Sequence, residues 1–214
     1  MISIVFIALI VLVSYFASGW IKKNSTWLYV GGTVLSIITI IFRDVPITVA
    51  INKGFLGFSF FYVVMIVGLF NREKAFYKRL HSVRSVLSIL GFILLTPHAI
   101  FYFIDKFTNN GLFDLAGLLA YVIMVPLFIT SFQKIEEPMK MMKWKKLQRF
   151  AYIAYILIFI HLIFVSSVPN LIVYIVLFVP YIIYKPYHFF KHEKPFYQTM
   201  KKKISQSQPK GEHQ

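Results

Sequence analysis

Two histidines lie inside long apolar runs of the sequence and are the side chains best placed to do chemistry. His98 falls in the run 82–104 and His161 in the run 148–166. If both runs are helices starting at one membrane surface, His98 lies about 21 Å beyond Arg84 and His161 about 18 Å beyond Arg149. Two imidazoles at matched depth can hold a haem iron from opposite sides. Alternatively, each histidine only forms a hydrogen bond with a neighbouring helix.

The elements that must position these histidines are suited to a membrane. Of the 214 residues, 58% are hydrophobic and only 14% are charged, which is far from the averages of a soluble domain. A helix needs about 20 apolar residues to cross the hydrocarbon of a bilayer. We therefore predict an all-α integral membrane helical bundle of about seven transmembrane helices, formed by the runs 2–20, 27–42, 50–70, 82–104, 112–133, 148–166 and 169–185.

The first of these runs has a second interpretation. Ala17-Ser18-Gly19 looks like a small-residue cleavage site, so this run could be a signal peptide. However, Lys22 and Lys23 follow the apolar run and no basic residue precedes it. This order of charges favours a retained span.

The positive charges predict the orientation. All but Arg43, Lys53 and Lys106 of the 23 basic residues fall in the segments 21–26, 71–84 and 134–149 or in the tail from residue 185. Short cytoplasmic loops collect Lys and Arg, and these segments are every second connection of a seven-span chain. We predict a multi-pass protein of the cell membrane, in contact with its lipids, with the N-terminus outside and a disordered basic cytoplasmic tail at 186–214.

The sequence excludes some cofactors and contains no motif for several classes of catalytic site. The net charge of +15 sits between apolar runs, which favours loop placement over a nucleic-acid partner. The chain has no cysteine, which excludes disulfides, iron–sulfur clusters and covalently attached haem. No phosphate loop, nucleophile elbow or paired-carboxylate arrangement is present, so we assign no catalytic residue and leave open whether the chain is an enzyme.

Two segments resemble the ferric-reductase-like transmembrane domain family, and within it the bacterial YedZ/MsrQ-type haem-binding membrane subunits. RSVLSILGFILLTPHAIFYF is similar to the family's arginine-to-histidine helix, with 14 residues from Arg84 to His98. SFQKIEEPMKMMKWKKLQRFAYIAYILIFIHLIF is similar to its second histidine helix. The match spans roughly 50–185. It implies a haem-binding domain at 27–185, preceded by an additional span and basic loop at 1–26.

The resemblance also implies the ligands of a cofactor. His98 and His161 would be the axial ligands of one haem b, and Arg84 would pair with an acidic group of the cofactor or with a lipid phosphate, although a cytoplasmic arginine needs no such role. Where the family's last histidine helix usually carries a first histidine, this chain has Gln148, which counts against a second haem. His81 could supply an inner ligand or could be a solvated loop histidine.

The expected activity follows from this cofactor. No segment outside the apolar runs is large enough for a flavin domain, so the electron donor would be a membrane quinol or a separate flavoprotein. The acceptor would be an extracytoplasmic partner or ferric iron. One alternative is a haem-binding anchor for an extracytoplasmic reductase such as a methionine sulfoxide reductase. Another is a haem-free membrane scaffold or small transporter.

Overall fold

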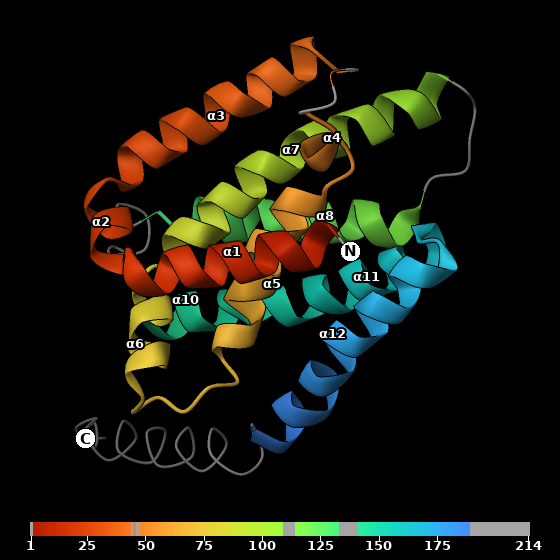
Figure 1. The fold of residues 1–214 in the computed structure, drawn as a ribbon. Coiled ribbons are helices and arrows are strands. Elements are labelled where there is room, and N and C mark those ends of the chain that lie inside the picture. Colours follow the sequence, from red (N-terminus) through yellow and green to blue (C-terminus); the bar gives the residue numbers. More distant parts are fainter. Residues whose placement is uncertain (1, 44, 46–47, 109–113, 133–140, 189–214) are drawn as a thin grey trace, which may run out of the picture. The chain divides into compact units, whose positions relative to one another are not determined.

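The computed structural model is all-helical in the residues that it describes, which are 2–43, 45, 48–108, 114–132 and 141–188 (Figure 1). The chain divides into two compact units, Met1–Tyr174 and Ile175–Gln214. Most of the predicted tail at 186–214 lies outside the described residues. The helices, in order, are α1 Ile2–Phe16, α2 Ser18–Lys23, α3 Ser25–Ile41, α4 Val49–Asn52, α5 Phe55–Val67, α6 Ala75–Ser82, α7 Arg84–Thr108, α8 Leu115–Ile129, α10 Met141–Gln148, α11 Phe150–Val165 and α12 Val168–His188.

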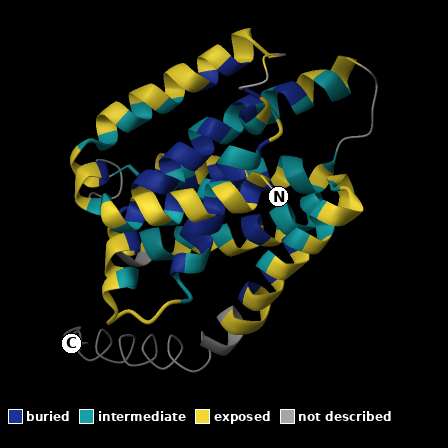
Figure 2. Ribbon diagram, in the orientation of Figure 1, coloured by how far each residue is buried: buried dark blue, intermediate teal, exposed yellow. Residues whose placement is uncertain are grey.

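Helices α5 and α7 form the centre of the first unit. Helix α5 packs against both α1 and α7, α3 packs on α7, and α8 packs along α11. Buried side chains concentrate on α5 and α7, as the dark blue ribbon in Figure 2 shows. Val63, Val67 and Ile89 are almost fully enclosed. The helix that carries His98 is therefore held on several sides by packed neighbours.

Each of the seven predicted apolar runs contains an apolar helix. Two of them are long and apolar enough to cross a bilayer, Arg84–Thr108 and Lys143–Val165, the second joining α10 to α11. The other five are shorter apolar helices, Ile2–Phe16, Ser25–Ile41, Phe55–Val67, Leu115–Ile129 and Val168–Tyr184. The all-α prediction is thus confirmed for the described residues. Two long apolar helices are a weak indication of a membrane protein, and the seven spans and their orientation stay a prediction.

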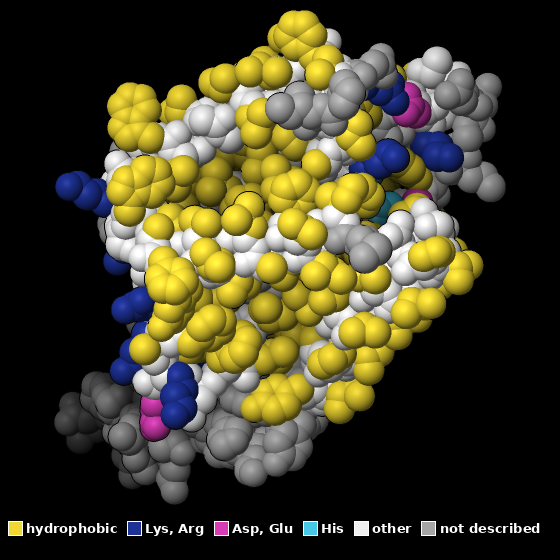
Figure 3. Space-filling model, in the orientation of Figure 1, with side chains coloured by type: hydrophobic (Ala, Val, Ile, Leu, Met, Phe, Trp, Pro, Cys, Tyr) yellow, Lys and Arg dark blue, Asp and Glu magenta, His cyan; other side chains and the backbone are white. Residues whose placement is uncertain are grey.

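Large hydrophobic side chains cover much of the outer surface. Trp27 is 76% exposed, Phe16 74% and Phe164 77%. Figure 3 shows hydrophobic side chains spread along the outward faces of α1 and α3. A soluble monomer rarely exposes so much contiguous apolar surface, which suits a chain whose helices face lipid.

The structure differs from the sequence prediction in several segments. The run 2–20 is divided between α1 and α2, and α2 extends into the basic segment 21–26. The run 50–70 is divided into α4 and α5 at Gly54, whose φ of 73° lies in the left-handed region that glycine enters at little cost. The basic segments 71–84 and 134–149, which we treated as loops, contain α6 and α10. Helix α6 forms because its Lys and Arg residues are good helix formers and because its own Leu80 side chain is fully buried.

A proline within α7 is compensated by a neighbouring helix. Pro97 has no N–H, so the carbonyl of Ile93, four residues earlier, loses its partner within the helix. The hydroxyl of Ser36 on α3 donates to this carbonyl at 2.9 Å. The bond links α3 to α7 in the turn of the helix that precedes Pro97 and His98.

Candidate functional site

His98 and His161 come together from α7 and α11. Their ring centroids are 6.2 Å apart, and the ring planes are inclined by 64°. Both side chains are partly buried. The two predicted histidines, 63 positions apart in the chain, are therefore neighbours in space; we call them the histidine pair.

The imidazole of His98 is held through its Nδ1 atom. Nδ1 lies 2.9 Å from the backbone carbonyl oxygen of Asn52, which can only accept, so Nδ1 carries the proton. This carbonyl is available because the chain turns at Gly54 instead of continuing α4. A Cβ atom at Gly54 would lie 3.1 Å from Cγ and Cδ2 of His98. The turn thus positions the ring and leaves Nε2 free of this bond.

The imidazole of His161 is held in the same way, by a carboxylate. Its Nδ1 atom is hydrogen-bonded to Oδ2 of Asp114 in a close contact. Asp114 is the N-cap of α8, and its Oδ1 accepts the backbone N–H of Ala116 at 3.0 Å. Its own backbone N–H donates to the hydroxyl oxygen of Tyr102 on α7. These bonds fix the carboxylate, which in turn orients the ring of His161.

A glycine allows this close packing beside His161. A Cβ atom at Gly117 would lie 2.8 Å from Nδ1 of His161 and 3.2 Å from Oδ2 of Asp114. A separation below about 3 Å requires one of the two side chains to move. Position 117 is therefore part of the site although glycine has no side chain of its own.

The arrangement fits two axial ligands of one metal centre. Histidines that bind metals usually donate the second ring N–H to a carbonyl or carboxylate, which fixes the tautomer with Nε2 free to bind. With about 2 Å from each nitrogen to a shared metal and about 1 Å more to each ring centre, opposed imidazoles have centroids about 6 Å apart. Both observations match the histidine pair.

The histidine pair offers two imidazole nitrogens as ligands. Within the part of the chain that the structure describes, no group of three or more His, Cys, Asp or Glu side chains is arranged to hold a metal ion. Two imidazoles alone are too few ligands for a stable site. A haem supplies the other four ligands itself, so two histidines suffice.

An open cleft borders the site on the Asp114 side. Its volume is about 530 Å³, and it is lined by Tyr102, Lys106, Asp114, Leu115, Ala116, Phe164 and Val165. The carboxylate that orients His161 therefore reaches a surface that another molecule can approach. Lys106 and Asp114 give the lining of this cleft one positive and one negative charge.

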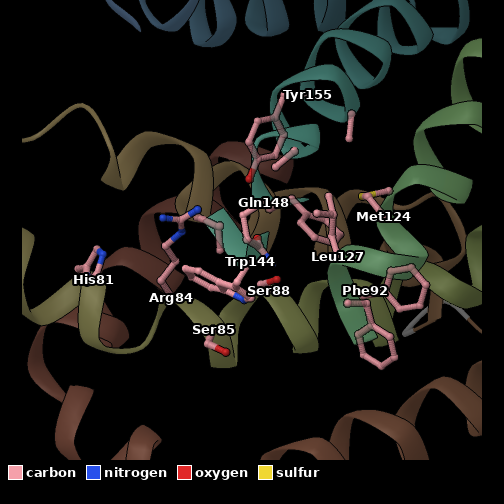
Figure 4. Close-up of a pocket in the computed structure, with 15 residues that line it drawn as sticks. His81, Arg84, Ser85, Ser88, Phe92, Met124, Leu127, Trp144, Gln148 and Tyr155 are labelled. Atoms are coloured by element: carbon pink, nitrogen blue, oxygen red, sulfur yellow. The ribbon is translucent and has the colours of Figure 1, made fainter. Parts of the chain in front are cut away.

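The third predicted site residue, Arg84, lies elsewhere. It begins α7, 14 residues before His98, and lines a separate cavity of about 210 Å³, together with Gln148 and His81 (Figure 4). Partial burial lowers the pKa of His81, and the positive charges of Arg84 and Arg72 lower it further. The structure thus groups Arg84 with Gln148 and His81, and separates all three from the histidine pair.

Sequence reasoning missed the residues that hold the two imidazoles. Asp114 could have been found, because it is one of only eight acidic residues and directly precedes the uninterrupted apolar stretch from Leu115, where an N-cap is expected. The roles of Asn52 and Gly54 could not, because a backbone carbonyl leaves no mark in the residue types.

Comparison with known proteins does not indicate a function, so the functional conclusion is based on the site itself. The chain matches no family model, no curated protein and no solved structure. The resemblance to ferric-reductase-like domains therefore stays an expectation.

Proposed function

We propose that this chain is an integral membrane protein that holds one haem b between His98 and His161 and passes electrons to an extracytoplasmic acceptor. The observation that carries the proposal is the histidine pair, with both Nδ1 atoms engaged and ring centroids 6.2 Å apart. A haem b would supply one-electron redox chemistry at this place.

The residues around the histidine pair would each have a distinct role. The carbonyl of Asn52 and the carboxylate of Asp114 hold the two rings in the tautomer that can bind iron through Nε2. The Asp114 carboxylate also places a negative charge beside His161, which favours the ferric state over the ferrous state. The buried faces of α5 and α7 exclude water from one side of the site.

The membrane placement rests on surface chemistry. The exposed apolar faces, the two long apolar helices and the confinement of basic residues to alternate connections support a seven-span chain with a cytoplasmic C-terminus. In this orientation the histidine pair lies in the outer half of the bilayer. Electrons would come from a membrane quinol or a flavoprotein, and the cleft beside Asp114 would face the acceptor.

The proposal is tested by the absorption spectrum of the purified protein. In detergent, with haem supplied during expression, we expect a reduced-minus-oxidised spectrum of a low-spin b-type haem at one haem per chain. His98→Ala and His161→Ala should each lose it. His81→Ala, which removes a histidine from the separate cavity, serves as the matched control and should keep full haem.

The outcomes discriminate between the rival functions. A colourless wild-type protein, or a histidine-pair variant that keeps full haem, overturns the proposal. The colourless result would favour a haem-free scaffold or transporter. Co-purification of a reductase with the haem-loaded chain would identify it as an anchor subunit for that enzyme.

A further inference from the structure

The cavity at the start of α7 has features that the histidine pair does not explain. It lies among α5, α6, α7, α8, α10 and α11, and its volume is about 210 Å³. For comparison, an apolar cavity of about 150 Å³ in a protein core accommodates one benzene ring. The cavity therefore has room for a single substituted ring.

The cavity is polar at one end and apolar at the other. Figure 4 shows His81, Arg84 and Ser85 toward one end, with Phe92, Met124 and Leu127 toward the other. Trp144 and Gln148 come from α10 between these two groups. A ligand that fits this division has an apolar body and one polar group.

The charge at the polar end has no counterpart in the described part of the chain. No Asp or Glu lines the cavity, and the guanidinium of Arg84 forms no hydrogen bond or ion pair with any described residue. By contrast, the indole N–H of Trp144 donates to the carbonyl of Thr130 at 3.1 Å, and the Gln148 amide lies 3.4 Å from the hydroxyl of Thr130. Among the described residues that line the cavity, Arg84 is thus a charged donor left over for a ligand.

From this geometry we propose that the cavity binds a one-ring aromatic anion, with its acidic group on Arg84 and its ring directed toward the apolar end. A guanidinium donates two parallel hydrogen bonds to a carboxylate, which suits a planar aromatic acid. Phe92, Met124 and Leu127 supply the apolar wall that a ring requires. The site is independent of the haem proposal, since it contains neither histidine of the pair.

The state of His81 agrees with an anion site. Its pKa is lowered by partial burial and by the nearby arginines, so the ring is neutral near pH 7 and adds no competing charge. A bound carboxylate would offset the field of Arg84 and raise the pKa of His81. This response provides a second readout at a residue other than Arg84.

The test uses 4-fluorobenzoate as the probe and the full-length protein in detergent. Binding is followed by the broadening of the ¹⁹F signal, and the histidine resonances are titrated with and without probe. We expect saturable binding, an upward shift in the pKa of His81, and at least about tenfold weaker binding by Arg84→Gln. Lys78→Gln, which removes an exposed charge near the cavity but outside its lining, is the matched control and should bind as wild type.

Two comparisons complete the test. The neutral 4-fluorobenzyl alcohol should bind much more weakly than the anion, and Ala151→Phe, which fills the cavity, should abolish binding without loss of Arg84. Equal binding by Arg84→Gln and wild type, or no binding by wild type, overturns the proposal. So does an anionic lipid that co-purifies with wild type but not with Arg84→Gln, because a lipid head group would then be the occupant.

Discussion

Replacing Asp114 with Asn tests whether a carboxylate sets the tautomer of His161. The two oxygens of the Asp114 side chain accept from different donors, Oδ2 from Nδ1–H of His161 and Oδ1 from the backbone N–H of Ala116. An asparagine has one oxygen and one NH₂ group, so it can satisfy only one of these donors. If the oxygen keeps the cap on Ala116, the NH₂ group faces His161 and forces its proton from Nδ1 to Nε2. A ring protonated at Nε2 cannot bind iron through that atom.

The magnitude follows from the kind of interaction lost. Mutating the partner that orients a metal-binding histidine costs about 10- to 100-fold in metal affinity. We therefore expect Asp114→Asn to bind haem about 10- to 100-fold more weakly and, where it retains haem, to show a higher midpoint potential. The potential rises because the lost negative charge stabilised the ferric state.

The matched control is Asp105→Asn on the same helix as His98. Asp105 is 46% exposed and pairs with Arg43, with Nη2 of the arginine 2.6 Å from Oδ2. An exposed ion pair of this kind contributes about 0–1 kcal/mol to folding stability. Asp105 holds neither imidazole of the histidine pair, so its replacement should leave the haem affinity unchanged.

The assay combines haem titration, potentiometry and nitrogen NMR. Long-range ¹H–¹⁵N spectra of the haem-free protein report the tautomer of His161 directly, so this part of the test is independent of haem binding. Wild-type affinity and potential in Asp114→Asn, with His161 still protonated at Nδ1, would refute the reasoning.

Three further predictions concern backbone and charge. Gly117→Ala places a Cβ atom 2.8 Å from Nδ1 of His161 and should lower haem retention in the absorption assay, whereas Gly19→Ala, which meets no atom within 4 Å, should not. Gly54→Ala forces a side chain into the left-handed region and should destabilise the protein by about 1–2 kcal/mol in thermal or denaturant unfolding. The lowered pKa of His81 means that the unfolded chain binds its proton more tightly. Wild type should therefore lose stability relative to His81→Gln as the pH falls through about 6.5. If the melting temperatures of the two proteins change equally between pH 7 and pH 5.5, this prediction is contradicted.

The proximity of the two histidines was predictable because helical rise is fixed. Counting residues from Arg84 and Arg149 places His98 and His161 at similar depth, and the structure brings their rings together. Their role as haem ligands stays a prediction. The helical runs were equally visible, since long apolar segments have few other ways to satisfy their backbone groups.

The sequence was less informative where backbone geometry decides. Gly54 sits within a continuous apolar run, so nothing in the residue types shows that α4 ends there and exposes the carbonyl of Asn52. The basic segments were interpreted by charge alone, which concealed that Leu80 gives α6 an apolar face. The cavity around Arg84 depends on how six helices pack, and no local pattern encodes that.

The bond from Ser36 to the carbonyl of Ile93 constrains the order in which two distant positions can change during evolution. While Pro97 is present, losing the Ser36 hydroxyl leaves that carbonyl without a donor, at a cost of about 1–3 kcal/mol. If Pro97 is replaced first, the new N–H can serve Ile93, and Ser36 becomes free to vary. Lineages of this protein should therefore lose the proline before the serine.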